Sequence, residues 1–390
     1  MRHVDVDERR ARLARRHRLA PGTEAADVAD AARAVVCLHA TDPATVHLSA
    51  WARVPGVTVD DVGRALYDDR TLVKHLAMRR TLFAVPVEAL PDVQAGASTR
   101  VAERERRRLV KLVEQAELVE DGGRWLARAE AAVLDELSNG RPATSSELRD
   151  RIPLLEGSLT IGEGRSWGGA TAVGPRVLTV LSASGSIVRS TNAGRWTASR
   201  PRWSATTAWL GAPIPEVGAE EALAGLVSRW LRAFGPGTED DIVWWLGATR
   251  TAVRAALRAV HAVEVDLDGP SVGHLLPDDV EPEDAVEPWA ALLPALDPTT
   301  MGWTGRDWYL GPHRDLLFDT NGNAGPTAWW DGRIVGGWRQ RDSGEVELQV
   351  LEDVGRDAMR ALRRRAEELS AWFDGERVLP RFPSPLWRAT

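Results

Sequence analysis

Apolar positions recur with a helical period through most of the first 120 residues. Asp42 and Pro43 form a helix-start signal, because an aspartate accepts from the first free backbone N–H groups and proline suits the first helical position. The pattern predicts helices at residues 4–18, 25–38, 43–53 and 58–67, a helix at 71–78 leading into a strand at 81–85, and a charged bridging helix at 100–118.

The next two stretches share one order of elements, three helices followed by a β-hairpin. This order is typical of the winged variant of the helix-turn-helix. In the first stretch the predicted helices are 124–138, 145–152 and 174–184, and the strands are 186–190 and 195–198, joined through a hairpin-type turn at 191–194. In the second they are 220–234, 238–246 and 250–260, with strands at 263–268 and 271–275.

The C-terminal region has β character. Turn signals at Asn321-Gly322-Asn323 and Asp331-Gly332 fit hairpins. The predicted strands are 308–309, 316–318, 327–330, 333–338 and 345–351, and a helix at 356–373 follows them. We expect a small antiparallel sheet or partial barrel capped by that helix.

Length and charge refine this picture. At about 150 residues per domain, 390 residues indicate two to four domains. The formal net charge is −7, but residues 261–300 hold ten acidic and no basic residues, so the remainder carries +3. Residues 141–210 hold nine arginines against four acids. This asymmetry permits a local basic groove for nucleic acid, although solvated surface arginines are the commoner explanation.

Several classes of protein are disfavoured. The one cysteine, Cys37, allows no intramolecular disulfide and no cysteine-rich zinc site. Lys74 and Lys111 are the two lysines, which makes Schiff-base chemistry improbable and leaves 47 of the 49 basic residues as arginine. The sequence contains no signal-peptide pattern and no apolar run of 18 residues. It also lacks a Walker motif, a pair of histidines spaced for one face of a helix, and the third glycine that a dinucleotide-binding loop would need after Gly162-x-Gly164. We therefore expect a cytoplasmic protein with no membrane span, metal or cofactor.

The candidate chemistry lies just before the helix at Pro43. His39 and Thr41 are two positions apart in an extended piece, so their side chains are expected to face the same way, near the positive end of the helix. Such a pair can hold and polarise one water. The alternative is structural: Asp42 caps the helix, Thr41 is a turn residue and His39 is a satisfied buried imidazole.

Two further groups suggest nucleic-acid contacts. Arg79 and Arg80 lie where the predicted helix meets a strand, and a guanidinium pairs well with a phosphodiester, although both residues also fit a solvated surface. Trp244 and Trp245 follow Asp240 and Asp241 in a predicted helix, where an indole stacks on a base or, more commonly, packs in the core.

Five motifs together resemble the tandem winged-helix family of AlkZ- and YcaQ-type DNA glycosylases, which excise bulky alkylated bases and unhook interstrand crosslinks. The resemblance covers nearly the whole chain. It rests on Leu38-His39-Ala40-Thr41-Asp42-Pro43, Trp51-Ala52-Arg53, Met78-Arg79-Arg80-Thr81-Leu82, Phe234-Gly235-Pro236-Gly237-Thr238 with Trp245, and Asp331-Gly332-Arg333-Ile334-Val335-Gly336-Gly337-Trp338.

The resemblance implies an α+β fold of three winged-helix modules followed by a small C-terminal β-barrel-like domain, arranged as a C-shaped body around duplex DNA. The expected boundaries are 1–118, 119–212, 213–277 and 278–390. The family's catalytic Gln-x-Gln or Gln-x-Asp falls on His39-Ala40-Thr41, so both glutamines are absent. Its Arg-x-Thr-x-His falls on residues 79–83, where Phe83 replaces the histidine.

The implied function is a monofunctional DNA glycosylase that acts on alkylated or bulky-adducted purines in duplex DNA as a monomer. His39 would accept a hydrogen bond from the attacking water, Thr41 would orient that water, and Asp42 would stabilise the developing positive charge. The candidate DNA contacts are Arg53, Arg79, Arg80, Arg165, Arg176 and Arg195. A non-catalytic duplex-binding protein, either a regulator or a shield for damaged DNA, is the alternative.

Overall fold

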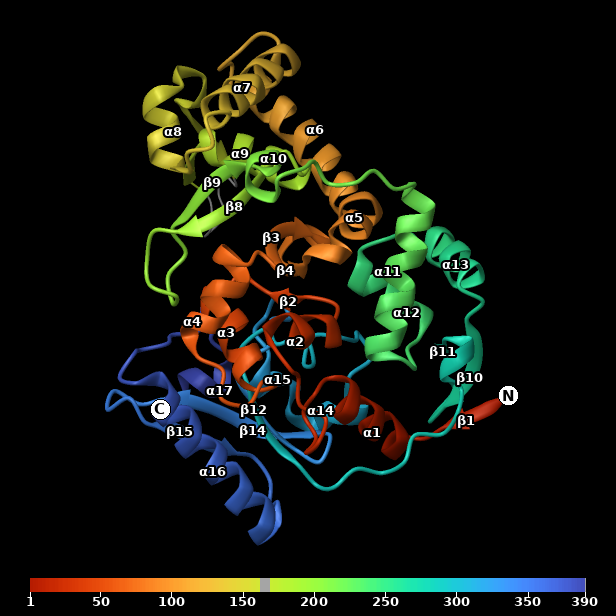
Figure 1. Cartoon of the computed structure of the whole chain (residues 1–390). Helices are drawn as coiled ribbons and strands as arrows, with labels where there is room; N and C mark the ends of the chain where they lie inside the picture. The colour runs from red at the N-terminus through yellow and green to blue at the C-terminus, as the bar shows by residue number, and fades with distance from the viewer. Residues whose placement is uncertain (162–168, 390) are drawn as a thin grey trace.

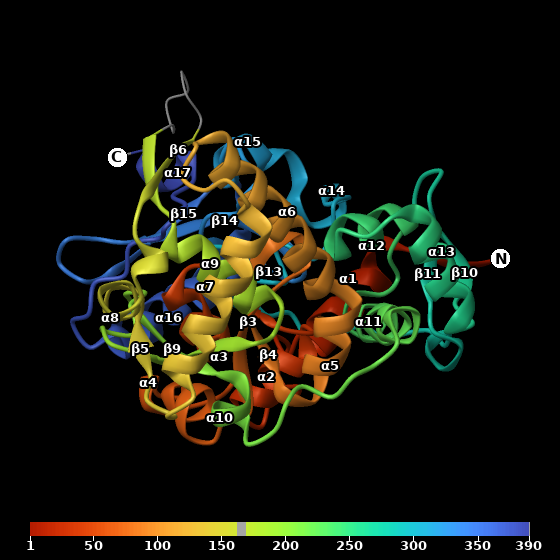
Figure 2. The ribbon, with the colours of Figure 1, turned by 90° about the horizontal axis from the view of Figure 1, so that it is seen from above.

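Four consecutive segments build the protein around several small sheets. The computed structural model describes residues 1–161 and 169–389. The described residues of the second segment, 119–161 and 169–212, lie at one end of the molecule and those of the C-terminal segment, 278–389, at the other, with residues 1–118 between them (Figure 1). The segment of residues 213–277 lies beside the first, at the edge that also carries the N-terminus (Figure 2).

The first segment is mostly helical and holds a three-stranded sheet in the order β2-β4-β3. The N-terminal strand pairs in parallel with β10 of the third segment, so the two segments share a second sheet. The elements are β1 (Arg2–Val4), α1 (Val6–Arg16), α2 (Val28–Ala34), β2 (Leu38–His39), α3 (Pro43–Trp51), α4 (Val59–Gly63), β3 (Leu72–Ala77), β4 (Thr81–Pro86), α5 (Leu90–Val93) and α6 (Thr99–Gln115).

The second segment has its own apolar core, which Leu109 and Val113 of α6 help to fill. Thr144 and Glu147 form a capping box that starts α8, each side chain bonding the other's backbone N–H. The elements are α7 (Gly122–Leu137), β5 (Ala143–Thr144), α8 (Ser145–Arg151), β6 (Ser158–Ile161), β7 (Gly169–Ala172), α9 (Gly174–Ala183), β8 (Ile187–Asn192), β9 (Pro201–Ala205) and α10 (Thr206–Leu210).

The third segment packs the apolar face of its long first helix into the largest apolar core among the described residues, which it shares with the first and fourth segments. Thr238 caps α12 in a second capping box, with Asp241. The elements are α11 (Ala219–Phe234), α12 (Glu239–Leu246), α13 (Arg250–Ala259), β10 (Val263–Leu267) and β11 (Val272–Leu275).

The fourth segment is a four-stranded antiparallel sheet in the order β12-β13-β14-β15, with α16 packed against it (Figure 1). In the described residues β12 and β15 are the edges of this sheet, so it is open and the expected barrel-like closure is not formed. The elements are β12 (Ala290–Leu293), α14 (Asp307–Leu310), α15 (Arg314–Leu317), β13 (Thr327–Trp330), β14 (Arg333–Gln340), β15 (Val346–Val350), α16 (Gly355–Phe373) and α17 (Pro385–Arg388).

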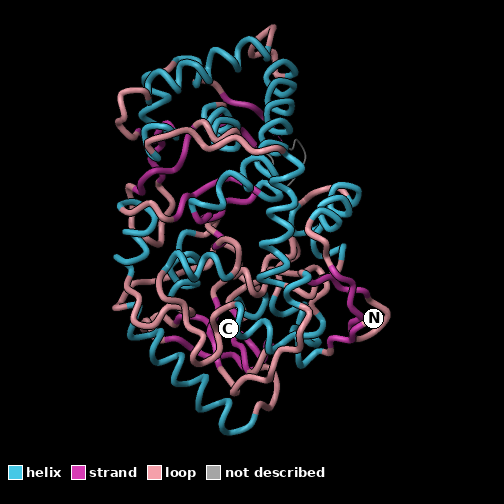
Figure 3. Tube along the Cα trace, turned by 45° about the vertical axis from the view of Figure 1, so that its right-hand side comes forward, coloured by secondary structure: helices cyan, strands magenta, loops and turns pink. Residues whose placement is uncertain are grey.

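The chain is therefore an α+β protein with small sheets distributed among its helices (Figure 3). No helix among the described residues is long and apolar enough to cross a membrane.

Several predicted elements have a different conformation. The helix predicted at 71–78 is strand β3, paired along its whole length with β4. The helix predicted from residue 4 begins two residues later, at Val6, because Val4 belongs to strand β1 and Asp5 is the N-cap. Residues 308–309 and 316–318, predicted as strands, lie mostly in the short helices α14 and α15. Strands β5, β6, β7 and β12 were not predicted.

The second strand of the hairpin in the second segment is also displaced. It was predicted at 195–198, but β9 spans Pro201–Ala205. The Asn192 amide group donates to the carbonyl oxygens of Gly194, Arg195 and Ala198, and its oxygen accepts from the backbone N–H of Arg200. One side chain thus organises a longer loop than the predicted four-residue turn.

Candidate active site

His39 lies in the short edge strand of the β2-β4-β3 sheet. It stands opposite Phe83 of β4, and the two rings meet edge to face with centroids 5.4 Å apart. The side chain is 9% exposed. The sequence places the imidazole here because β2 must stop at the helix-start signal of Asp42 and Pro43, three residues later.

The imidazole of His39 is neutral at physiological pH. Burial, reinforced by the positive charge of Arg79, lowers the pKa of His39 to about 3. The backbone N–H of Thr41 donates to Nδ1 over 3.4 Å, a long bond that favours the tautomer with the proton on Nε2. His39 therefore presents a neutral donor and a partly engaged acceptor.

Asp42 caps α3, as the sequence predicted. One carboxyl oxygen accepts from the backbone N–H of Ala44 (3.2 Å) and the other from that of Arg381 (2.9 Å). Burial raises the pKa of Asp42, and these two bonds offset part of that rise. The Arg381 guanidinium also donates to the carbonyl oxygen of Thr41, so the C-terminal segment closes over residues 41 and 42.

The turn between β3 and β4 carries two arginines in an unusual backbone conformation. Arg79 and Arg80 have φ angles of 55° and 62°, and a hairpin turn with two positive φ values normally uses Asn or Gly. Such strain is commonly found at functional sites. The Arg79 guanidinium lies 4.0 Å from the centre of the Trp244 ring, and that of Arg306 lies 5.0 Å from it. Trp244 thus stacks on arginine, whereas Trp245 is buried in the core.

Two of the predicted DNA contacts lie close together. Arg80 is half exposed and pairs with Glu105 at 3.0 Å. Burial, together with the positive charges of Arg108 and Arg80, lowers the pKa of Arg176. This cluster of Arg80, Arg108 and Arg176 joins the β3–β4 turn to the start of α9. Arg195 is exposed in the β8–β9 loop and pairs with Glu376.

Arg53 is not available to DNA and is corrected to a structural residue. Its side chain is fully buried, and its guanidinium donates to both carboxyl oxygens of Asp297 at 2.9 and 2.8 Å. It also donates to the carbonyl oxygen of Ser49 and to the hydroxyl of Thr299. Arg165, another predicted contact, lies outside the described residues.

Sequence reasoning missed a set of cations on the other side of the 40–43 loop. Lys74 and Arg189 line a small cavity together with Ala40 and Pro43. Burial, and then the charge of Arg189, lowers the pKa of Lys74 to about 8, while its Nζ donates to the Tyr67 hydroxyl at 2.6 Å. The one feature of the sequence that could have drawn attention to Lys74 was the rarity of lysine.

The described residues contain no group of His, Cys, Asp and Glu side chains suited to hold a metal ion. The geometry around His39 therefore consists of a neutral imidazole, a hydroxyl, a capping carboxylate and nearby arginines.

Comparison with known proteins identifies the family. The model of the family described as DNA glycosylase AlkZ-like matches residues 32–372. The chain belongs to the AlkZ-like DNA glycosylase family. The fold is similar to that of Streptomyces sahachiroi DNA glycosylase AlkZ, with a TM-score of 0.75 and 21% identity over 97% of this chain and 99% of that one. No curated protein matches the sequence significantly.

Membership of the AlkZ-like family confirms the resemblance drawn from the five motifs. It also supports DNA repair by glycosidic bond hydrolysis, with DNA as the substrate.

Proposed function

We propose that this protein is a monofunctional DNA glycosylase that removes alkylated or bulky-adducted purines from duplex DNA, acting as a monomer. The observation that carries the proposal is the neutral imidazole of His39 beside Thr41, in the region of the basic β3–β4 turn. Family membership supplies the reaction class.

The reaction needs a positioned water more than a strong base. An N-alkylated purine already carries positive charge, so the C1′–N bond breaks with its electron pair moving to the base. Water then forms the new bond at C1′ and loses a proton to solvent. Because the contact with Thr41 favours the proton on Nε2, the role expected from the sequence is reversed: His39 would donate to the water oxygen instead of accepting from the water, and the Thr41 hydroxyl would accept one of the water's hydrogens. The negative charge of Asp42 would stabilise the sugar cation while it caps α3.

The DNA would be held by guanidinium groups near this site. Arg80 and Arg176 form one cluster, Arg79 lies at the same turn, and Arg195 extends from the β8–β9 loop. We propose that the three helix-rich segments act as winged-helix modules on the duplex, with these arginines at phosphates.

Non-catalytic binding to duplex DNA is the second candidate. It is favoured by the burial of His39 and by the engagement of both Asp42 oxygens in backbone bonds, as the structural alternative for this motif expects. The two candidates share DNA binding and differ in base release.

The test measures base release from duplexes that contain N7-methylguanine, N3-methyladenine or a bulky N7-alkylguanine. We expect His39→Ala to slow release about 100-fold, as is typical on loss of a positioned polar group. His39→Gln should keep most of the rate, because an amide is also a neutral hydrogen-bonding group. His261→Ala, at an exposed histidine, is the matched control.

Each outcome selects one candidate. Release by the wild type with loss in His39→Ala, while the variant keeps its fold and DNA affinity, supports the glycosylase. Release that survives His39→Ala contradicts the assigned role of His39. Binding without release from all three duplexes favours the non-catalytic protein.

A further inference from the structure

Four cations lie in a row along one face of α6. The α6 row consists of Arg100, Arg104, Arg108 and Lys111. At about 3.6 residues per turn these positions fall within about 80° of the helix circumference, and no acidic residue of α6 falls within that arc. Arg104, Arg108 and Lys111 are exposed, and Arg100 is partly exposed. The row therefore presents a continuous strip of positive charge to solvent.

Salt bridges within the protein do not neutralise this strip. In the described part of the chain, the salt bridges of α6 join Glu105 to Arg80, Arg106 to Glu130 and Arg107 to Glu103. None of them engages a member of the α6 row. Burial, and then the positive charge of Arg104, lowers the pKa of Arg100, with a smaller opposite effect of Glu103. Neighbouring cations of the row thus act on each other without a carboxylate between them.

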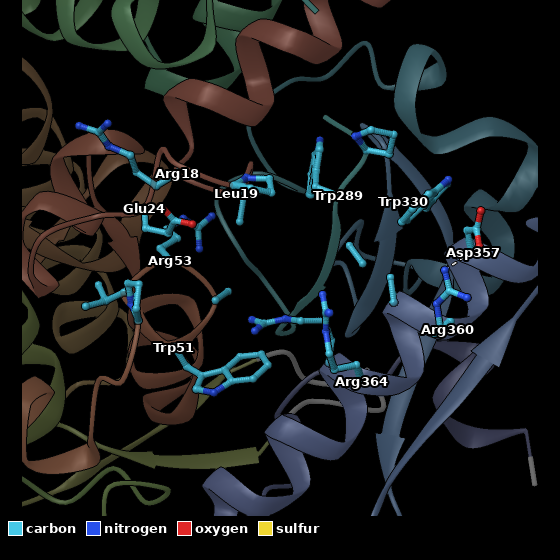
Figure 4. Close-up of a pocket in the computed structure, with 18 residues that line it drawn as sticks. Arg18, Leu19, Glu24, Trp51, Arg53, Trp289, Trp330, Asp357, Arg360 and Arg364 are labelled. Carbon is cyan, nitrogen blue, oxygen red and sulfur yellow. Dashed lines mark hydrogen bonds and ion pairs between the residues drawn. The ribbon is translucent and has the colours of Figure 1, made fainter. Parts of the chain in front are cut away.

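Arginines that gather elsewhere are neutralised by the protein itself. A cavity of about 730 Å³ between the first and C-terminal segments has several arginines in its wall (Figure 4). Each of these arginines pairs with a carboxylate: Arg18 with Asp30, Arg53 with Asp297, Arg360 with Asp357, and both Arg364 and Arg365 with Glu368. The α6 row differs from that cluster, because its charge is left for a partner outside the chain.

The fold gains nothing from the row as it stands. Like charges four positions apart on a helix destabilise it. Arg100 with Arg104, and Arg104 with Arg108, are two such pairs in succession. An anionic partner laid along the helix would turn this repulsion into attraction.

Helix α6 holds the row beside the predicted DNA contacts. Glu105 of α6 pairs with Arg80 of the β3–β4 turn at 3.0 Å. The charge of Arg108 contributes to the lowered pKa of Arg176, so these two guanidinium groups are neighbours. The helix runs from the first segment into the second, whose apolar core it helps to fill (Figure 1). Packing on both sides fixes the row relative to the β3–β4 turn.

We propose that the α6 row binds consecutive phosphates of one strand of duplex DNA, carrying the contact surface from the β3–β4 turn toward the second segment. The row is about 16 Å long, at about 1.5 Å per residue. One strand of B-DNA carries a phosphate about every 3.4 Å of its axis, so about five phosphates match the length of the row. Guanidinium groups pair well with phosphate oxygens. The inference rests on the proposed action on duplex DNA and adds the direction in which the duplex leaves the site.

The experiment measures binding of the full chain to an undamaged fluorescent duplex over a range of salt concentrations. The triple variant Arg100→Gln/Arg104→Gln/Arg108→Gln should bind at least about tenfold more weakly at about 0.1 M salt. It should also reduce by about 3 the slope of the logarithm of the binding constant against the logarithm of salt concentration. Arg106→Gln is the control on the same helix, because Arg106 lies outside the row and already pairs with Glu130 at 2.5 Å. It should leave the slope unchanged.

A second control removes the same amount of charge at the other end of the molecule. Arg356, Arg360 and Arg363 are exposed on α16. The triple variant Arg356→Gln/Arg360→Gln/Arg363→Gln should keep the wild-type slope. This comparison separates contacts with phosphate from the effect of net charge.

Folding of the variants is measured by urea unfolding. Because like charges are removed from a helix, the α6 triple variant should keep or raise the urea midpoint of the wild type. A lower midpoint would show that the arginines serve the fold and would contradict the proposal. If the triple variant does not fold, Arg104→Gln alone gives the same test, with an expected fall in slope of about 1.

Two binding results would overturn the proposal. These are a wild-type slope in the α6 triple variant, and an equal fall in slope in the α6 and α16 triple variants. Either result contradicts the row alone and leaves the proposed glycosylase standing. No duplex binding by the folded wild type would contradict the proposed function and this inference with it. Because the duplex is undamaged, failure of base release does not alter the outcome of this test.

Discussion

Replacing Asp297 with asparagine should strongly destabilise the protein. The Asp297 carboxylate is fully buried and accepts four hydrogen bonds, two from Arg53 and one each from Ser49 and the backbone N–H of Thr299. Burial alone would raise its pKa, but the charge of Arg53 and these bonds lower it below the ordinary value. The pair joins the end of α3 to the C-terminal segment.

The expected cost follows from what the substitution leaves behind. Asp297→Asn keeps the size of the side chain but leaves the Arg53 cation buried and unpaired, which costs about 3–5 kcal/mol. The double variant Arg53→Met/Asp297→Leu removes both charges and should recover part of that loss, because desolvation of the ions is relieved. The surface pair of Arg360 and Asp357, about four-fifths exposed on each side, should lose less than about 1 kcal/mol in Asp357→Asn.

Urea unfolding followed by tryptophan fluorescence and circular dichroism measures these differences. A loss below about 1 kcal/mol in Asp297→Asn, equal to that of the surface control, would refute the reasoning. If the double variant loses as much as the single variants Arg53→Met and Asp297→Leu combined, the two residues do not interact.

Three further predictions concern buried histidines, DNA contacts and the thiol. Burial lowers the pKa of five histidines, most strongly in four of them, so the unfolded chain takes up the protons of these four near pH 6.5 while the folded chain does not. Stability should fall by about 2 kcal/mol per histidine from pH 7 to pH 5, and an unchanged urea midpoint would contradict this. The four are His17, His39 and His47, with pKa values of about 3, and His75, at about 4. Arg80→Ala and Arg176→Ala should each weaken duplex binding and reduce by about 1 the slope of the logarithm of the binding constant against the logarithm of salt concentration. Arg363→Met should leave that slope unchanged. Equal slopes in all three variants would show that Arg80 and Arg176 do not contact DNA phosphates. Cys37 is buried and its pKa is raised, so iodoacetamide should label it only after urea unfolding, and rapid labelling of the native protein would contradict its burial.

Helices with strong local signals were predictable from the sequence. Asp42 and Pro43 gave the start of α3, and the apolar periodicity of α11 and α16 gave their extents within one residue. Strand β3 was missed because its sequence has apolar positions compatible with a helix, and its strand state depends on pairing with β4, a tertiary contact.

Long-range contacts also explain the other errors. Strand β1 exists because β10, some 260 residues later, offers its edge in parallel. The aromatic runs at Trp308 and Phe318 were predicted as strands, but Tyr309 packs on Trp329 and Arg306 lies over Phe318 in a helical surrounding. The strand propensity of two or three residues does not show such tertiary contacts.

The helix cap at Asp42 was predictable from the sequence, whereas the surroundings of several candidate residues were not. The 38–43 motif correctly located the cap and the neighbouring polar residues, but burial of Arg53 depends on Asp297, a partner 244 positions away. The basic N-terminus is likewise neutralised by the acidic stretch, since Arg12 and Arg16 pair with Asp279 and Arg15 with Glu283. Charge counts along the chain do not show such pairings.

The most direct measurement is single-turnover base release from an alkylated duplex by the wild type across pH 6 to 8, with circular dichroism confirming the folded state at each pH and His39→Ala alongside. Because the imidazole of His39 stays neutral down to about pH 3, we predict release by the wild type at a rate that does not follow a titration near pH 6.5, and little release by His39→Ala. No base release at any pH, or equal release by both proteins, would contradict the account.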